Sequence, residues 1–250
     1  MPSSSIEFLL NDELVTINDL NTNTTVLEYL RNYKNLKGTK EGCASGDCGA
    51  CTAVIAELKN NKLKYKSINT CITLLYSLHS KQLLTVEYIE SKYLHPVQQS
   101  MVDNDGAQCG FCTPGFIMSM YAMHKNKISP TDSNINRYLS GNLCRCTGYR
   151  PIKEALKNLK KYKDLESDTS KVFKKLKKIK LSDVVLTRDG SKFYIHQNLK
   201  NFKKDFIKSK SPSLLVGGTD ISLDITKKRK NLNEIFYLGQ NRDLTYVRMK

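Results

Sequence analysis

The sequence has no run of about eighteen consecutive apolar residues, the length that a membrane-spanning helix requires. Residues 1–5 also lack the basic side chains of a secretory signal peptide, and the apolar stretch that follows ends at Leu10. These absences predict a soluble, cytoplasmic protein that is not membrane-bound. Thiols stay reduced in that compartment, so the eight cysteines indicate metal sites rather than disulfides.

Arginine is scarce: only 8 of the 40 basic residues are arginines, although the formal net charge is +16. Proteins that bind nucleic acids rely on the planar guanidinium group for two-point contacts with bases and phosphates. Seventeen of the lysines lie between residues 151 and 210. We interpret the charge as a solvated, lysine-rich helix face and linker, and we predict no nucleic-acid partner.

Three cysteines lie in one short glycine-rich loop, and a fourth follows after nineteen intervening residues. They are Cys43, Cys48, Cys51 and Cys71. This C-x4-C-x2-C pattern with a distant cysteine is typical of plant-type ferredoxins, which hold a [2Fe–2S] cluster with two thiolates on each iron. A disulfide framework and a structural zinc are the alternatives, but zinc sites usually use cysteine pairs rather than a triplet.

The other four cysteines form two close pairs that are thirty-one residues apart. They are Cys109, Cys112, Cys144 and Cys146. Each pair precedes a helix that is predicted to begin at a proline, Pro114 or Pro151. The dipoles and free amides of these helices would stabilise thiolate charge. A zinc knuckle is the competing interpretation, although a C-x-C pair is unusual for zinc.

Apolar and polar residues alternate in a pattern that predicts hairpins over residues 6–17 and 52–66. Between them, Thr25 begins a predicted helix with the form of a capping box, and this helix should end near residues 36–38. Residues 116–123 are apolar on nearly all sides, so they predict a buried central helix. The four histidines show no ligand-like spacing and are interpreted as ordinary surface or core residues.

Four strings surround the cysteines: GTKEGC, GDCGACT, QCGFCTPG and GNLCRCTGYRPI. In combination they resemble the molybdenum hydroxylases of the xanthine dehydrogenase family, including the bacterial small subunit that carries two [2Fe–2S] clusters and FAD. The resemblance covers roughly residues 5 to 160. It implies an α+β fold with a β-grasp ferredoxin-like domain at 1–90, a helical [2Fe–2S]-binding domain at 91–164, a lysine-rich linker at 165–181 and the start of an α+β FAD-binding domain at 182–250.

An apolar strand near the end of the chain runs into a glycine pair, where successive backbone amides can point into one concavity and bind phosphate oxygens. Alone this signal is weak, but beside two ferredoxin-type modules it resembles the FAD diphosphate loop of the same family. The residues concerned are Leu214, Leu215, Val216, Gly217, Gly218, Thr219, Asp220 and Ile221. Only 69 residues run from 182 to 250, so we expect either a fragment or an incomplete flavin domain.

The resemblance implies an electron-transfer subunit of xanthine dehydrogenase, in which a molybdenum centre on a partner chain hydroxylates a purine. Electrons then pass through two clusters to FAD and on to NAD. Gln108 and Cys146 are candidates to contact the pterin, and no catalytic residue is expected in this chain. The implied partners are a molybdopterin-binding large subunit and NAD, within a higher hetero-oligomer. A different molybdenum hydroxylase, acting on aldehydes or N-heterocycles, and a zinc-bearing interaction module remain the alternatives.

Overall fold

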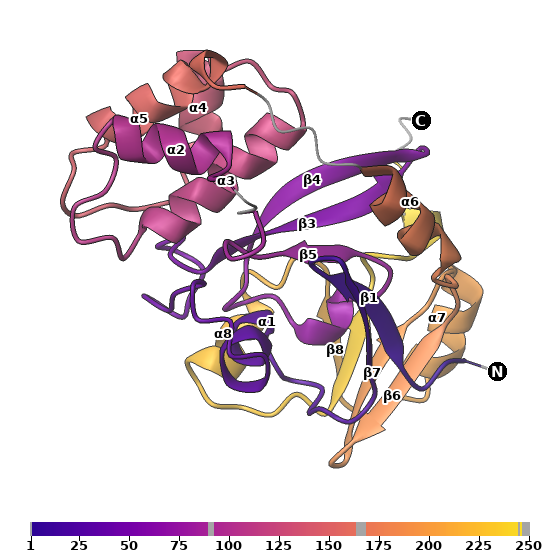
Figure 1. Ribbon diagram of the computed structural model, residues 1–250. Coiled ribbons are helices and arrows are strands. Elements are labelled where there is room, and N and C mark those ends of the chain that lie inside the picture. Colours follow the sequence, from indigo (N-terminus) through magenta and orange to yellow (C-terminus); the bar gives the residue numbers. More distant parts are fainter. Residues whose placement is uncertain (1, 90–92, 164–168, 245, 247–250) are drawn as a thin grey trace, which may run out of the picture.

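The computed structural model describes residues 2–89, 93–163, 169–244 and 246. Within these residues the chain forms a five-stranded sheet, a helical lobe at one end of that sheet and a four-stranded sheet at the other side (Figure 1). The strand orders are β2-β1-β5-β3-β4 and β6-β7-β9-β8. None of the helices described in these ranges is long and apolar enough to cross a membrane.

The five-stranded sheet is built from the two hairpins that the sequence predicts. The β1–β2 hairpin turns at Asn11, and the β3–β4 hairpin turns at Asn60 and Asn61, all with positive φ, which asparagine tolerates better than most residues. The short strand β5 pairs in parallel with β1 and antiparallel with β3, so it joins the two hairpins. The strands are β1 (Ile6–Leu10), β2 (Glu13–Ile17), β3 (Thr52–Lys59), β4 (Lys62–Asn69) and β5 (Gln82–Leu84).

The predicted capping interaction is present at the start of the first helix, where the Thr25 hydroxyl accepts a hydrogen bond from the Glu28 amide at 3.1 Å. Helix α1 (Val26–Glu28) continues directly as the π-helical turn η1 (Tyr29–Tyr33). The expectation that this helix reaches residues 36–38 is wrong. Asn35 takes a φ of 54°, in the left-handed region where a right-handed helix cannot continue.

The helical lobe packs on the end of the first sheet through α3. Residues 115–123 of α3 are all buried, as the apolar sequence predicts, and they share one core with Val54 and Ala56 of β3. Both prolines lie in first helical turns, Pro114 in α3 and Pro151 in α5. The helices are α2 (Pro96–Asp103), α3 (Thr113–Lys125), α4 (Asp132–Leu139) and α5 (Arg150–Lys157), followed by the 3-10 turn η3 (Asn158–Lys161).

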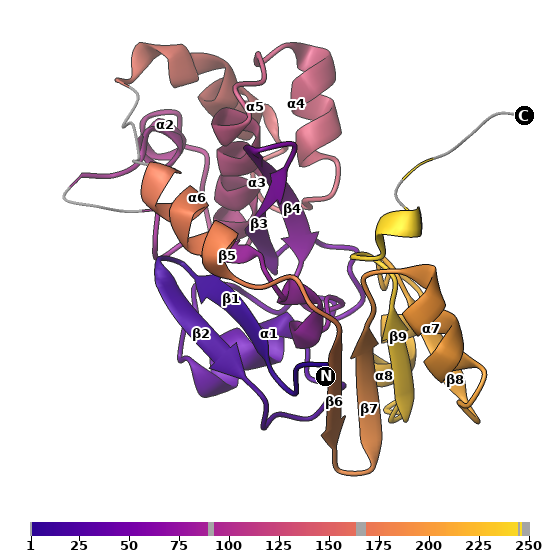
Figure 2. The same cartoon turned by 90° about the vertical axis from the view of Figure 1, so that its right-hand side faces the viewer.

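The segment that the sequence predicts as a linker contains helix α6 (Thr169–Lys178). Val172 and Leu176 are buried on one side of this helix, in a small core with Leu9 of β1, while its lysines face outward. Figure 2 shows α6 lying across the first sheet on its way to β6. The segment is therefore helical and docked over the residues that the structure describes here.

Residues 182–244, called the third region below, form the four-stranded sheet. Its core is continuous with the first domain, because Phe193 packs against Tyr76 of the short 3-10 turn η2 (Leu75–Leu78). Ser3 also pairs with Val184, which places the chain start beside β6 (Figure 2). The elements are β6 (Val184–Arg188), β7 (Ser191–Ile195), α7 (Leu199–Phe206), β8 (Pro212–Leu215), α8 (Ile221–Thr226), β9 (Glu234–Tyr237) and η4 (Arg242–Leu244).

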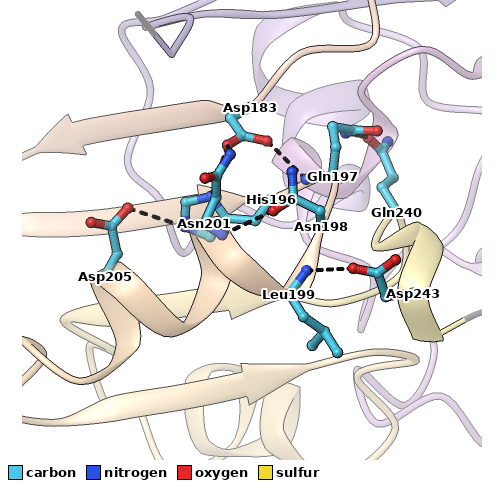
Figure 3. Close-up of polar contacts among 9 residues, drawn as sticks. All are labelled: Asp183, His196, Gln197, Asn198, Leu199, Asn201, Asp205, Gln240 and Asp243. Atoms are coloured by element: carbon cyan, nitrogen blue, oxygen red, sulfur yellow. Dashed lines mark hydrogen bonds and ion pairs between the residues drawn. The ribbon is translucent and has the colours of Figure 1, made fainter.

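A polar network around the buried side chain of His196 holds α7 against this sheet (Figure 3). His196 Nδ1 lies 3.4 Å from Asp183 Oδ2, and its Nε2 lies 3.2 Å from Asp205 Oδ2. Asp183 also accepts hydrogen bonds from the Gln197 amide and the Asn201 side chain. His196 is thus a core residue that links the entry of β6, the exit of β7 and helix α7.

Candidate iron–sulfur sites

The β3–β4 hairpin brings together two cysteines of the first set. Cys51 lies immediately before β3, and Cys71 lies two residues after the end of β4. The antiparallel register pairs Thr52 with Asn69, and the Thr70 amide donates to the Cys51 carbonyl at 3.3 Å. Both cysteines are almost fully buried, with exposed fractions of 2% and 3%. Residues twenty positions apart therefore become neighbours because of the ladder between them.

The loop before β3 wraps around the sulfur of Cys43. This sulfur accepts hydrogen bonds from the amides of Ser45 at 3.4 Å, Asp47 at 3.3 Å and Cys48 at 3.4 Å. Burial raises the pKa of the Cys43 thiol, but the hydrogen bonds from Ser45, Cys48 and Asp47 outweigh it and lower the pKa to about 6. The loop is thus shaped to hold a negative sulfur.

The thiols of the first set interact in pairs. The hydrogen bond with Cys71 is the main reason that the pKa of Cys51 is lowered to about 7, and the same bond raises the pKa of Cys71. Cys48 pairs in the same way with Cys43, and its pKa is raised chiefly by burial. The first set therefore consists of two adjacent thiol pairs, Cys43 with Cys48 and Cys51 with Cys71.

The second set is assembled by two loops of the helical lobe. Cys112 is the N-cap residue of α3, and the loop that carries Cys144 and Cys146 runs into α5. The sulfurs of Cys109 and Cys146 are 3.6 Å apart, and Cys112 shares a hydrogen bond with Cys144. Burial and that bond raise the pKa of Cys112 to about 12. This set also forms two thiol pairs.

Both sets fit a [2Fe–2S] cluster in their donor chemistry, because each iron of such a cluster takes two thiolates and each set supplies two close thiol pairs. Cys43, Cys48, Cys51 and Cys71 would hold one cluster, and Cys109, Cys112, Cys144 and Cys146 would hold the other. Over the described residues, no three or more His, Cys, Asp or Glu side chains are arranged to hold a single metal ion.

The surface around the second set is open. Cys109 and Cys146 are exposed, as are the neighbouring side chains of Gln108, Phe111 and Leu143. These five residues are called the second cysteine surface below. The predicted pterin contacts, Gln108 and Cys146, are therefore accessible on this surface, and their contact with a pterin stays a prediction.

The predicted phosphate loop lies next to the first cysteine set. It follows β8, and Gly218 within it is buried with a φ of 76°. A Cβ on Gly218 would lie 2.9 Å from the carbonyl oxygen of Ile72, the residue after Cys71. The side chain of Lys227 donates a hydrogen bond to the Cys43 carbonyl. Val216, Gly217, Thr219 and Asp220 are exposed, and a Cβ on Gly217 would meet no atom within 4 Å. The space beside Gly217 is therefore open.

Two adjacent sets of paired thiols, one on a ferredoxin-like sheet and one on a helical lobe, have the donor chemistry of two [2Fe–2S]-binding domains. Two known families of iron–sulfur cluster binding domains match this chain. Residues 8–76 match the family described as 2Fe-2S iron-sulfur cluster binding domain. Residues 85–157 match the family described as [2Fe-2S] binding domain. These two matches confirm that the chain contains a ferredoxin-like and a helical [2Fe–2S]-binding domain. The third region lies outside both matched ranges.

Proteins similar in sequence to this chain include xanthine dehydrogenases and aldehyde oxidases. The chain is 46% identical over 157 residues to xanthine dehydrogenase/oxidase of Mus musculus, covering 62% of this chain and 12% of that protein. It is 43% identical over 159 residues to the probable aldehyde oxidase gad-3 of Caenorhabditis elegans, covering 62% of this chain and 13% of that protein. The chain thus spans only about an eighth of the length of these relatives.

Among solved structures, quinoline 2-oxidoreductase from Pseudomonas putida 86 matches with a TM-score of 0.52 and 29% identity, over 62% of this chain and 90% of that chain. Aldehyde oxidoreductase from Desulfovibrio gigas matches with a TM-score of 0.54 and 29% identity, over 62% of this chain and 16% of that chain. This chain is homologous to the iron–sulfur region of xanthine dehydrogenases and aldehyde oxidases, which confirms the family resemblance of its motifs.

Proposed function

We propose that this chain is the iron–sulfur and flavin subunit of a xanthine dehydrogenase. In this proposal it carries electrons from a molybdenum centre on a partner chain, through two [2Fe–2S] clusters, to FAD and then NAD. The overall reaction would be the hydroxylation of hypoxanthine or xanthine in purine catabolism, in the cytoplasm. No residue of this chain would act on the purine itself.

The observation that carries the proposal is the direct contact between the two cysteine loops. The Leu143 amide, next to Cys144, donates to the carbonyl of Cys48 at 2.9 Å. Two complete sets of thiols therefore lie on neighbouring loops rather than at opposite ends of the molecule. When bound, the clusters would supply one-electron acceptors, and the chain's own residues hold the two sites close together.

The open second cysteine surface supports a partner on that side. Thiols near water and exposed apolar side chains such as Phe111 and Leu143 favour coverage by another protein surface. We propose that a molybdopterin-binding large subunit covers it, with Gln108 and Cys146 towards the pterin, within a higher hetero-oligomer. The chain alone should then show no hydroxylation of xanthine, and turnover by the purified chain would contradict this assignment.

Metal and sulfide analysis after anaerobic purification tests the central proposal. We expect about four irons and four acid-labile sulfides per chain and no stoichiometric zinc. After reduction with dithionite, electron paramagnetic resonance should show two distinct signals, because the two sets differ in burial and hydrogen bonding. A colourless protein with zinc in place of iron would instead support the zinc-bearing interaction module.

A different molybdenum hydroxylase is a second candidate, because the relatives include both kinds of enzyme. Identity to a xanthine dehydrogenase is 46%, and identity to an aldehyde oxidase is 43%, over nearly the same stretch. Substrate choice would be made in the partner, so the two candidates differ only in the assembled enzyme. Turnover of aldehydes or quinoline-like heterocycles in preference to xanthine by that assembly would favour the second candidate.

The open space at Gly217 allows a sharp test of the proposed FAD loop, formed by residues 214–221. A Cβ on Gly217 would meet no atom within 4 Å, so Gly217→Val should leave folding unchanged while it crowds a bound diphosphate. Gly218→Val is the less informative variant, since its Cβ already approaches the Ile72 carbonyl at 2.9 Å. Unchanged FAD affinity in a folded Gly217→Val enzyme would place the flavin elsewhere.

A further inference from the structure

Asn142 is a buried polar residue at the contact between the two cysteine loops, within the string GNLCRCTGYRPI. Its side chain is 3% exposed. The side-chain nitrogen donates to the Gly49 carbonyl at 3.0 Å and to the Thr52 hydroxyl at 3.1 Å. Its side-chain oxygen accepts from the Ser119 hydroxyl at 2.6 Å. Both donors and the acceptor of the amide are therefore used.

Asn142 and its partners lie on three segments, each of which also carries cysteines. Gly49 lies between Cys48 and Cys51, Ser119 lies on the helix that follows Cys112, and Asn142 precedes Cys144 by two residues. A single side chain thus ties the first cysteine loop to both cysteine loops of the helical lobe. We call this group the inter-loop junction: Gly49, Thr52, Gly115, Ser119 and Asn142.

The backbones at the junction approach so closely that only glycine fits. A Cβ on Gly115 would lie 2.2 Å from the Gly49 carbonyl oxygen. A Cβ on Gly49 would lie 2.2 Å from the Gly141 carbonyl oxygen, and Gly49 also has a φ of 70°. The Gly49 carbonyl accepts from the Thr52 amide and hydroxyl as well as from Asn142. The loops are therefore fixed by steric contact and by hydrogen bonds.

We infer that Asn142 is a positioning residue that sets the separation and orientation of the two cysteine sets. This inference rests on the proposed function, because the spacing of the two sets matters only if they hold clusters. The hydrogen bonds of Asn142 are present in the structure whichever function is correct. Asn142 aligns the loops so that the Leu143 amide donates to the Cys48 carbonyl at 2.9 Å. Because Leu143 directly precedes Cys144, this one hydrogen bond connects two candidate ligand residues, Cys48 and Cys144. A buried amide with every hydrogen bond satisfied specifies one arrangement, because any shift leaves polar atoms unpaired.

The experiment compares three alanine variants of the full chain. Asn142→Ala removes both side-chain bonds from Asn142 to the first cysteine loop, together with its bond from Ser119. Ser119→Ala removes only the bond within the helical lobe, and Asn136→Ala changes an exposed asparagine on α4 as the matched surface control. Hydrogen exchange at the Leu143 amide is measured by mass spectrometry, and the magnetic interaction between the two reduced centres is measured by electron paramagnetic resonance.

We expect Asn142→Ala to raise the hydrogen-exchange rate of the Leu143 amide by about tenfold, the scale of losing the cross-loop hydrogen bonds. The splitting caused by the magnetic interaction between the two centres should broaden, while both signals persist. Asn136→Ala should change neither readout, and Ser119→Ala, which leaves the two bonds to the first cysteine loop in place, should change both by less than Asn142→Ala. Thr52→Val, which keeps the side-chain shape, should shift both readouts in the same direction by a smaller factor if Asn142→Ala does not fold. Unchanged exchange and unchanged magnetic interaction in folded Asn142→Ala, or in folded Thr52→Val where Asn142→Ala does not fold, would overturn the inference.

The two proposals fail separately. If the unaltered chain assembles no iron–sulfur centre after anaerobic purification, the proposed function is wrong, and exchange at Leu143 still decides whether Asn142 holds the loops together. If both centres assemble and exchange at Leu143 does not respond to either junction variant, the proposed function stands and the role of Asn142 is refuted.

Discussion

The two cysteine sets have the same donors but opposite surroundings. In the first set, Cys51 and Cys71 are 2% and 3% exposed, and three backbone amides point at the sulfur of Cys43. In the second set, Cys109 and Cys146 are exposed at the end of the helical lobe. Burial, hydrogen bonds to sulfur and solvent access are the properties by which proteins tune iron–sulfur potentials. The two sites should therefore differ in potential and in lability.

The difference follows from how each set is assembled. A β-ladder joins Cys51 to Cys71, so the sheet itself shields that pair. The second set is joined by loops at helix starts, which lie on the surface and leave one side uncovered. The buried site is suited to an interior position in an electron-transfer chain, and the open site is suited to contact with a partner.

The largest effect should come from removing one ligand of the buried set. Cys48→Ser should eliminate one of the two resonance signals and about two of the four irons, because each set is complete within its own loops. The signal of the second set should remain. Iron analysis and electron paramagnetic resonance on the same anaerobic sample measure both quantities.

Cys112→Ser is the matched variant in the helical lobe, and it should remove the other signal. A partition into independent sets is contradicted if either variant abolishes both signals while circular dichroism shows that the chain is still folded.

The second effect concerns lability in the isolated chain. In the first set Cys51 and Cys71 are buried, so a chelator should reach iron held by this pair only after local opening of the β3–β4 region, whereas Cys109 and Cys146 of the second set are exposed. Iron should therefore be lost at least about tenfold faster from the second set than from the first set. This ratio corresponds to a free energy of local opening of at least ~1.4 kcal/mol at the first set. Stopped-flow absorbance with each single-set variant separates the two rates.

Addition of the partner subunit should slow iron loss from the second set alone. Equal rates for the two sets in the free chain would show that the difference in exposure has no kinetic consequence.

Sequence patterns predicted local features of the fold around both cysteine sets. Proline positions predicted the starts of α3 and α5, and the apolar run predicted the buried helix α3. Each of these signals lies within a few residues of the feature that it predicts. The Thr25 cap is a further example, since it acts on an amide only three residues away. The assignment of the cysteines as cluster ligands stays a prediction.

The contacts between segments were not predictable in the same way. The bond between Asn142 and Gly49 joins residues 93 positions apart, and neither residue type indicates a partner by itself. The docking of α6 on Leu9 could not be predicted either, because the lysine-rich sequence of α6 resembles a solvated linker. Only the buried side chains of Val172 and Leu176 distinguish this helix from a linker. Helix length also depended on one local conformation, the positive φ of Asn35. The first two features depend on tertiary packing, and the third depends on a single backbone conformation, so periodicity predicts none of them.

A third comparison uses one glycine from each cysteine loop. Gly49 and Gly110 both have positive φ, 70° and 79°, but a Cβ on Gly110 would meet no atom within 4 Å. Gly110→Ala should cost about 1–2 kcal/mol for the left-handed conformation alone. Gly49→Ala should cost about 3 kcal/mol or more, because overpacking against the Gly141 carbonyl adds to the same strain. Thermal or urea unfolding of the two variants measures the difference, and equal losses would indicate that the junction relaxes around the new methyl group.

The smallest effect should come from single hydroxyl groups beside the sulfurs. The Thr147 hydroxyl lies 3.1 Å from the sulfur of Cys144, whereas the buried Thr70 hydroxyl donates to the backbone carbonyl of Cys51 at 2.7 Å. A hydrogen bond to a sulfur stabilises the added electron, so Thr147→Val should lower the reduction potential of the second site. Loss of about 1 kcal/mol in a one-electron couple corresponds to roughly 40 mV, since 59 mV is a factor of ten. Thr70→Val should shift the potential of the first site by less, because the bond that it removes ends on a carbonyl oxygen and not on a sulfur. Redox titration followed by electron paramagnetic resonance measures both, and a larger shift for Thr70→Val would show that hydroxyl bonds to sulfur do not set the potentials.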